Sequence, residues 1–323
     1  MIKPKVLITK TIPKEVENYI AQHCDYKIRS FDGKIDKELL FNELQDTEGL
    51  LTSGTKINEE LLSHAPKLKV VSNISVGYNN FDLGCMKARK VMGTNTPGVL
   101  DDTVADLVFA LVLSAARRIS ELDAYVKKGK WRESDNENLF GVDVHHSTLG
   151  IIGMGRIGET IAKRARLGFD MEVLYYNRSM KPKIEKELGV EYSSLEDLLK
   201  KSDYIVVMTP LTKETEHIID YKEFDLMKKS AIVINASRGK TINEEALIDA
   251  LKNKRILAAG LDVYSVEPVN LDNPLLKMPN VVTIPHIGSA TSKTRFDMSM
   301  LAAKNLIIAL SGHTPPNLVP ELK

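Results

Sequence analysis

The sequence has little cysteine, no long apolar run and no excess of charge of either sign. Its two cysteines, Cys24 and Cys85, cannot build a disulfide framework and show no metal-ligand spacing. We therefore expect a reducing compartment and no bound metal. The longest apolar stretch, residues 107–116, is about half of what a bilayer requires. The apolar run near the N-terminus is also too short for a signal peptide.

Charge is nearly balanced, with 44 basic and 43 acidic residues. This balance gives no basic footprint for nucleic acid or for an anionic membrane surface. Together with the absences above, it indicates a cytoplasmic protein with neither nucleic acid nor membrane as a partner. The chain has 323 residues, 43% of them apolar, which is enough for two globular domains.

Short apolar runs alternate with helical spacing along most of the chain, a pattern that predicts parallel sheets joined by right-handed crossovers. Strands are expected at residues 5–9, 49–54, 68–75, 148–152, 171–176, 204–208, 231–235, 256–263 and 281–285. Helices are expected at residues 13–21, 39–44, 58–64, 101–116, 158–165, 195–200, 244–251 and 291–310. Asp101 or Asp102 is a good N-cap for the fourth of these helices.

The segment from residue 125 to residue 147 has no clear period and is long for a simple connection. It carries the only tryptophan, Trp131, together with Phe140. Exposed aromatic residues are a modest signal of an interface. The segment is therefore a subunit contact, part of a substrate mouth or a plain surface loop.

A glycine-rich turn follows the strand at residues 148–152. Gly153, Gly155 and Gly158 have the spacing G-x-G-x-x-G and lead into a predicted helix. The first glycine permits the tight turn, the second lets a pyrophosphate reach the backbone, and the third lets the helix pack close to the strand. The helix N-terminus adds N–H groups and a partial positive charge. Because strand and helix both fit, we favour a dinucleotide site over an ordinary structural turn.

The end of the next strand indicates which dinucleotide is preferred. Asn177, Arg178 and Ser179 lie where such a fold usually has an acidic residue for the ribose 2′-hydroxyl. Without that carboxylate a 2′-phosphate is not repelled, and Arg178 offers a planar fork of donors to it. The sequence therefore favours NADP over NAD, although Arg178 could simply be a solvated arginine at a strand end.

Four ionisable residues follow the remaining predicted strands: Arg238, Asp262, Glu267 and His286. Reduction of a carbonyl requires one group that orients the substrate and another that protonates the forming alkoxide. Histidine suits the second task near neutral pH, and a neighbouring carboxylate favours its protonated form. Arginine suits a 2-keto acid because its fork meets a carboxylate in two hydrogen bonds.

Each of these residues taken singly has a plainer interpretation. His286 could be a core histidine, Glu267 a turn residue before a proline, and Arg238 a cap at a helix C-terminus. Their joint placement just past strands of one dinucleotide-binding sheet favours an active site.

The glycine turn, residues 236–239, 260–263, Glu267–Pro268 and 285–291 together resemble the D-isomer-specific 2-hydroxyacid dehydrogenase family. The similarity is collinear over essentially the whole chain. It implies two Rossmann-like or flavodoxin-like, doubly wound parallel-sheet α/β domains with the active-site cleft between them. Residues 1–100 plus 291–323 would form the substrate-binding (catalytic) domain, and residues 101–290 the NAD(P)-binding Rossmann domain. Homodimers are usual in the family.

The resemblance also implies roles for individual residues. Arg238 would bind the substrate carboxylate and carbonyl, His286 would be the acid/base, and Glu267 would pair with it. The backbone at Val76 and Gly77 would hold the substrate carboxylate. The expected cofactor contacts are Thr103, Gly153, Gly155, Arg156, Ile157, Gly158, Asn177, Arg178, Ser179, Thr209, Pro210, Ala236, Arg238, Asp262, His286 and Ser289.

Within the family, residues 177–179 and 288–291 are similar to glyoxylate/hydroxypyruvate reductases and 2-ketogluconate reductases. We therefore expect an enzyme that reduces glyoxylate, hydroxypyruvate or 2-keto-D-gluconate to the D-2-hydroxy acid, preferring NADPH, with NAD possible. An NAD-dependent dehydrogenase of the phosphoglycerate or D-lactate type is the alternative within the family. A non-catalytic, dinucleotide-sensing scaffold like the corepressor relatives is the alternative of another class.

Overall fold

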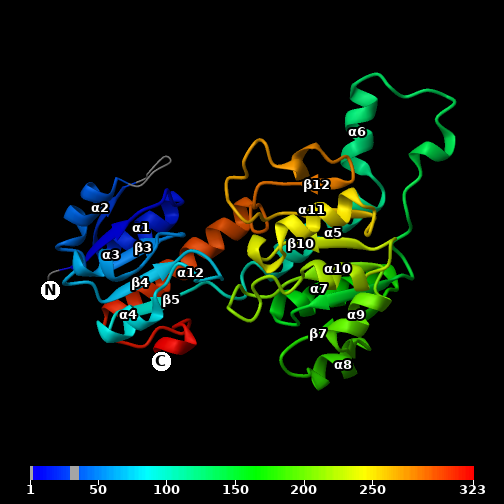
Figure 1. Cartoon of the computed structure of the whole chain (residues 1–323). Coiled ribbons are helices and arrows are strands. Elements are labelled where there is room, and N and C mark those ends of the chain that lie inside the picture. The colour runs from blue at the N-terminus through cyan, green and yellow to red at the C-terminus, as the bar shows by residue number, and fades with distance from the viewer. Residues whose placement is uncertain (1–2, 30–35) are drawn as a thin grey trace. The chain divides into compact units, whose positions relative to one another are not determined.

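The structure is a computed structural model that describes residues 3–29 and 36–323. The chain divides into two compact units (Figure 1). Unit 1 comprises residues 1–100 and 290–323, and unit 2 comprises residues 101–289.

The described part of unit 1 is built on a five-stranded parallel sheet with the order β2-β1-β3-β4-β5. This is the flavodoxin-like order, in which the order of the strands reverses between β1 and β3. The strands are β1 (Lys5–Ile8), β2 (Asp25–Ile28), β3 (Gly49–Thr52), β4 (Val70–Asn73) and β5 (Met92–Thr94). The helices are α1 (Lys14–His23), α2 (Lys37–Leu44), α3 (Glu59–Ser63), α4 (Leu83–Ala88) and α12 (Ser292–Leu310).

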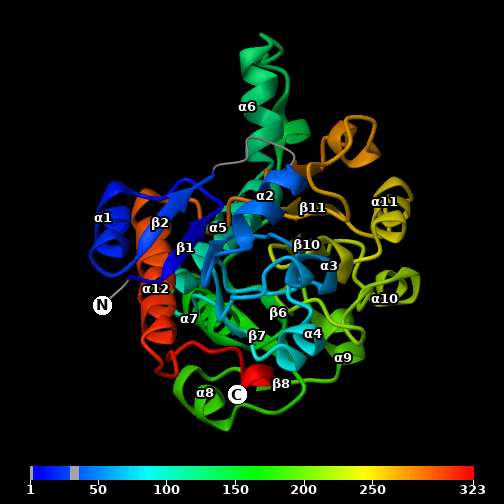
Figure 2. The ribbon, with the colours of Figure 1, turned by 90° about the vertical axis from the view of Figure 1, so that its left-hand side faces the viewer.

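Helices cover both faces of this sheet. A cluster of buried side chains from β1, β3 and β4, including Leu7, Leu50 and Val71, packs against α2, α3 and α4. On the other face α12 contacts α1, β3 and β4, and Figure 2 shows α1 and α12 side by side. The Ser72 hydroxyl donates a 2.8 Å hydrogen bond to the Ala302 carbonyl, so the C-terminal helix is anchored to β4.

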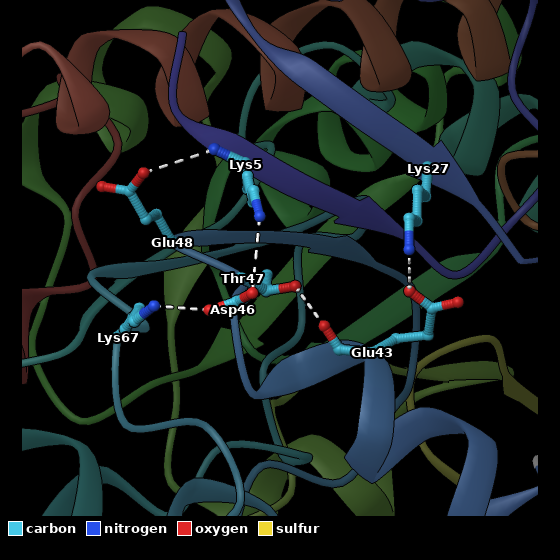
Figure 3. A network of polar contacts seen from close by, with 7 residues as sticks. All are labelled: Lys5, Lys27, Glu43, Asp46, Thr47, Glu48 and Lys67. Atoms are coloured by element: carbon cyan, nitrogen blue, oxygen red, sulfur yellow. Dashed lines mark hydrogen bonds and ion pairs between the residues drawn. The ribbon is translucent and has the colours of Figure 1, made fainter. Parts of the chain in front are cut away.

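Charged side chains gather where the strands of unit 1 begin (Figure 3). Asp46 forms ion pairs there with Lys5, at 3.4 Å, and with Lys67. Glu43 forms a 2.8 Å pair with Lys27, which lies further along, near the end of β2. Lys5 and Asp46 are both more than half exposed, and solvent screening leaves such pairs little influence on stability. This edge of the sheet is a solvated surface, and ligands of open α/β sheets bind at the opposite, carboxyl edge.

The described part of unit 2 contains a seven-stranded parallel sheet with the order β12-β11-β10-β9-β6-β7-β8. Counted from β6, this is the doubly wound dinucleotide-binding order, extended by one strand. The strands are β6 (Thr148–Ile152), β7 (Glu172–Tyr176), β8 (Glu191–Tyr192), β9 (Tyr204–Val207), β10 (Ile232–Asn235), β11 (Ala258–Leu261) and β12 (Val281–Thr283).

Two layers of helices enclose the seven-stranded sheet. The longer helices of unit 2 are α5 (Asp101–Ala116), α6 (Ile119–Lys127), α7 (Arg156–Phe169), α8 (Pro182–Leu188), α9 (Leu195–Lys201), α10 (Tyr221–Leu226) and α11 (Glu244–Lys252). Helices α9, α10 and α11 share one apolar cluster with the sheet, while α5 and α7 pack against each other and against its other face. Helix α6 stands away from the sheet (Figure 1).

The predicted fold class of two doubly wound, parallel-sheet α/β units is confirmed. Strands β2, β5 and β8 were not predicted, because they lie at sheet edges and have short or weakly apolar patterns. The predicted cap of α5 is wrong, because the helix already includes both Asp101 and Asp102. The aperiodic segment at residue 125 also begins inside α6. No helix among the described residues is long and apolar enough to cross a bilayer.

Candidate active site

The glycine turn lies at the switch point of the seven-stranded sheet, after β6 and between β9 and β7. Gly153 has φ +108°, and a Cβ there would lie 2.6 Å from the Met208 carbonyl oxygen. A Cβ on Gly158 would overlap the Gly153 carbonyl, so the third glycine is required for α7 to leave the turn. A Cβ on Gly155 would meet no atom within 4 Å. Packing within the protein therefore does not require a glycine at this exposed position, which leaves room for a ligand.

A buried tyrosine holds the loop that follows β7. The Tyr175 hydroxyl accepts a 2.6 Å hydrogen bond from the Lys181 N–H and donates a 2.6 Å bond to Glu185. Burial and the bond to Glu185 raise the pKa of Tyr175 to about 12, so the hydroxyl stays neutral. Asn177 bonds across the loop to the Ser179 carbonyl at 3.0 Å. Arg178 is exposed and has no ion-pair partner within residues 3–29 and 36–323.

The N-terminal turn of α5 approaches the glycine turn. The Asp101 carboxylate lies 3.5 Å from Nε of Arg156, the first residue of α7. Burial raises the pKa of the Asp101 carboxyl, and the Arg156 charge opposes that rise. Thr103 is half buried in the same turn of α5, and Ile157 is half buried in the first turn of α7.

Two further predicted cofactor contacts follow β9. Thr209 is half buried, and its hydroxyl oxygen is buried without a hydrogen-bond partner in the part of the chain that the structure describes. Pro210 is exposed beside it, and Ala236, after β10, is half buried. A buried hydroxyl without a partner, next to the turn where Gly155 leaves open space, fits a ligand with polar groups. These residues could hold a dinucleotide.

His286 and Glu267 form a hydrogen-bonded pair. His286 Nδ1 lies 2.7 Å from Glu267 Oε2, and the two side chains are 47% and 36% exposed. His286 is therefore not a core histidine, because nearly half of it is open to solvent. Burial by itself would raise the pKa of Glu267, but the hydrogen bonds from His286 and the Tyr264 N–H, with the charges of His286 and Arg238, lower it overall.

Arg238 lies three residues beyond the end of β10, and Glu267 and His286 follow β11 and β12. All three therefore lie at the carboxyl edge of the same parallel sheet. Burial lowers the pKa of its guanidinium, and the Glu267 carboxylate opposes this. An arginine remains protonated under either influence. One of its nitrogens donates a 2.6 Å bond to the Ser237 carbonyl. The guanidinium is thus a fixed positive charge close enough to Glu267 to influence its ionisation.

Asp262 is buried, with 1% of its surface exposed, and accepts hydrogen bonds from the backbone around His286. Its two carboxylate oxygens accept the N–H groups of Ile287, at 2.6 Å, and Gly288, at 2.9 Å. Its carbonyl accepts the His286 N–H at 2.9 Å. His286 has φ +50°, a left-handed conformation that is uncommon for a histidine. These three bonds hold the histidine in that conformation, and Ser289, half buried, follows directly.

In unit 1, Val76 and Gly77 follow β4 at the carboxyl edge of the five-stranded sheet. Both of their carbonyls are engaged: Asn95 donates a 2.8 Å bond to that of Val76, and Ser75 a 2.5 Å bond to that of Gly77. Among the described residues, no acceptor takes the N–H of either residue. The turn therefore presents two adjacent backbone donors with a fixed orientation.

A dinucleotide-binding sheet and a histidine–carboxylate pair beside an arginine define a nicotinamide-dependent oxidoreductase. A family model for the NAD-binding domain of D-isomer specific 2-hydroxyacid dehydrogenases matches residues 109–288. The chain is 47% identical over 320 residues to glyoxylate/hydroxypyruvate reductase B of Yersinia enterocolitica, covering 98% of each protein. The chain therefore belongs to the D-isomer specific 2-hydroxyacid dehydrogenase family and is an NAD(P)-dependent enzyme.

Solved structures agree with this. An NADPH-dependent glyoxylate/hydroxypyruvate reductase from Sinorhizobium meliloti, in complex with NADP and malonate, superposes with a TM-score of 0.85 at 30% identity, covering 99% of this chain and 98% of that one. A D-lactate dehydrogenase from Aquifex aeolicus, complexed with NAD and lactic acid, has a TM-score of 0.84 at 31% identity, covering 95% of this chain and 96% of that one. The predictions of family and enzyme class are confirmed.

Three residues near these groups were not predicted to take part in the site. Tyr175 belongs to the strand expected at residues 171–176, Glu244 begins the helix expected at residues 244–251, and Tyr264 lies outside every expected element. Each acts through a backbone group or a partner distant in sequence, and the sequence contained no signal for those contacts.

Proposed function

We propose that this enzyme reduces small 2-keto acids, such as glyoxylate, hydroxypyruvate and 2-keto-D-gluconate, to D-2-hydroxy acids. The observation that supports this best is the 2.7 Å contact between His286 Nδ1 and Glu267 Oε2, because it holds a carboxylate against an imidazole that is nearly half exposed. The relatives named glyoxylate/hydroxypyruvate reductase support the substrate class.

His286 is the proton donor in this proposal. Glu267 accepts the hydrogen bond from Nδ1 and so leaves Nε2 to give its proton to the substrate oxygen as negative charge develops there. The backbone bonds from Ile287 and Gly288 to Asp262 hold the segment that carries the imidazole, and Glu267 orients the ring itself. In the oxidative direction the neutral imidazole accepts the same proton.

The substrate carboxylate meets fixed donors. Arg238 offers a guanidinium that can bind a carboxylate in two hydrogen bonds, and the charge also polarises the neighbouring carbonyl. The N–H groups of Val76 and Gly77 in unit 1 are proposed as donors to a substrate carboxylate, which makes unit 1 the substrate-binding domain in this proposal. A compound that lacks the carboxylate should bind poorly, because these donors would then have no partner.

Unit 2 holds the nicotinamide cofactor at the glycine turn, with Thr103, Arg156, Ile157, Thr209, Pro210, Ala236 and Ser289 around it. When bound, the reduced nicotinamide supplies the hydride that adds to C2 of the keto acid. We further propose a preference for NADPH, with NADH accepted more weakly. Support comes from the exposed, unpaired Arg178 between Asn177 and Ser179, and from the NADP bound by the Sinorhizobium relative.

A homodimer is the proposed assembly. Three exposed apolar side chains of unit 2, Phe140, Val142 and Leu257, line a cavity of about 250 Å³ between the end of α5, the start of α6 and the start of β11. Ile119, Val126 and Trp131 are further exposed apolar side chains on and after α6. Apolar surface of this kind on a soluble protein usually marks an interface. A second copy of this chain is the proposed occupant, since homodimers are usual in the family.

The test of the reaction is a panel of substrates with the purified enzyme. Glyoxylate, hydroxypyruvate, pyruvate, 2-ketogluconate and 3-phosphohydroxypyruvate are each supplied with NADPH or NADH, and loss of absorbance of the reduced nicotinamide is followed. We expect turnover of at least one short keto acid, and a loss of at least about 100-fold in kcat for His286→Ala. Near-native turnover by that variant with every keto acid would contradict the assignment of the proton donor.

A further inference from the structure

The turn that carries Glu267 is held from behind by a second glutamate. Glu244 is the first residue of α11, and its Oε2 accepts a 3.1 Å hydrogen bond from the Ser265 N–H. Its Oε1 accepts a 2.9 Å bond from the Asn273 side-chain amide. Both carboxylate oxygens therefore accept hydrogen bonds from the same loop, residues 264–273, one near each of its ends.

The Glu267 side chain is bonded to the same turn at Tyr264, the residue before Ser265. Its Oε1 accepts a 3.1 Å bond from the Tyr264 N–H, while Oε2 faces His286. Two successive backbone N–H groups, of Tyr264 and Ser265, are thus taken by two glutamates. A displacement of this turn moves Glu267 away from His286, since the carboxylate is tied to the turn's backbone.

Two further contacts fix the position of the turn in unit 2. A Cβ on Gly239 would overlap the backbone of Tyr264, so the turn packs directly on the loop that begins with Arg238. The Tyr264 hydroxyl donates a 3.2 Å bond to the carbonyl of Ile284, two residues before His286. The turn therefore contacts the segments of all three proposed active-site side chains.

We infer that Glu244 is a positioning residue for the acid–base pair, acting through the Ser265 N–H and the turn that carries Glu267. This inference rests on the proposed role of Glu267 and His286. The charged groups around the pair are Arg238 after β10, Asp262 after β11, and Glu267 and His286 themselves. Glu244 affects the reaction by fixing the position of Glu267 relative to these other charged groups.

The experiment compares pH profiles of kcat for glyoxylate or hydroxypyruvate reduction with NADPH. Glu244→Ala should lower kcat about tenfold, because small displacements of reacting groups are costly, while changing the KM for NADPH less than about twofold. Its profile should shift in the same direction as that of Glu267→Gln. Glu244→Gln retains an oxygen for the Ser265 N–H and should remain within about twofold of the unmodified enzyme.

Glu245 supplies the matched control. It is the next residue of the same helix turn, is exposed, and its side chain makes no hydrogen bond or ion pair with the loop among the described residues. Glu245→Ala should leave the pH profile unchanged. If Glu244→Ala is too unstable to assay, Glu244→Asp keeps the charge at the helix N-terminus but withdraws the carboxylate from Ser265, and the same shift is expected.

The double variant Glu244→Ala/Glu267→Gln separates positioning from a general structural effect. If Glu244 acts through Glu267, the double variant has the pH profile of Glu267→Gln alone. An additive loss that is equal at every pH would overturn the inference. A shift for Glu267→Gln with none for Glu244→Ala would overturn it and leave the proposed function standing. An unchanged profile for Glu267→Gln would instead overturn the proposed acid–base pair and the inference with it.

Discussion

Replacement of Glu267 by glutamine tests the acid–base pair most directly. Glutamine has nearly the same shape and keeps an oxygen for the Tyr264 N–H, so the turn should persist. What disappears is the negative charge 2.7 Å from His286 Nδ1. A protonated imidazole then loses its partner, and reduction, which consumes that proton, becomes less effective as the pH rises.

The size of the effect follows from the exposure of the pair. A hydrogen bond between charged groups contributes about 1.5–3 kcal/mol. The side chains are 47% and 36% exposed, and solvent screening brings the contribution to the lower end of that range. A loss of about 1.4 kcal/mol corresponds to a factor of about ten. On the alkaline side of the profile, kcat/KM for reduction should therefore fall about tenfold, so that the profile moves to lower pH.

The assay is kcat/KM for the best keto acid from about pH 5 to pH 9, the range in which histidine titrates. The oxidation of the D-2-hydroxy acid requires a neutral imidazole, so its profile should also extend to lower pH. Glu245→Gln serves as the control. Superimposable profiles for Glu267→Gln and the unmodified enzyme would refute the reasoning and make Glu267 a purely structural residue.

The same pair has a consequence for stability. The pKa of Glu267 lies below its usual value, so the stabilisation from the pair is present above that usual value, about 4.3, and is lost as the pH falls through the lowered pKa. The unfolding temperature of the unmodified enzyme should fall more steeply on acidification than that of Glu267→Gln. Parallel curves would show that the pair contributes nothing to folding.

Four further predictions concern the cofactor and the assembly. Gly158→Ala should lower the free energy of unfolding by about 1–3 kcal/mol and weaken NADPH binding, because its Cβ overlaps the Gly153 carbonyl. Gly155→Ala should weaken NADPH binding without lowering stability, since its Cβ meets no protein atom and enters only the space left for the ligand. Unchanged affinity in a fluorescence titration would exclude a pyrophosphate there. Arg178→Ala should raise the KM for NADPH about tenfold and leave that for NADH nearly unchanged, and equal changes would remove the argument for NADPH. Phe140→Asp should give monomers in sedimentation velocity, and an intact dimer would place the interface elsewhere.

Local regularities of the sequence were enough to predict the fold class and the dinucleotide-binding turn. Strands such as β9 and β10 are continuous apolar runs that are buried throughout, and the glycine spacing directly encodes a conformation that other residues cannot adopt. Edge strands such as β2 escaped prediction because their pattern is only half buried. An edge position depends on which strands are neighbours, and neighbouring strands are distant in sequence.

For the active site, the sequence determined which chemical groups are available, and the tertiary structure decided which of them act on one another. The residue types at positions 238, 267 and 286 follow from reading the chain. Their relation depends on strands β10, β11 and β12 ending at one edge of a sheet. The roles of Asp262, Tyr175 and Glu244 came only from the folded chain, because each side chain binds a backbone N–H whose availability no pattern of residue types records.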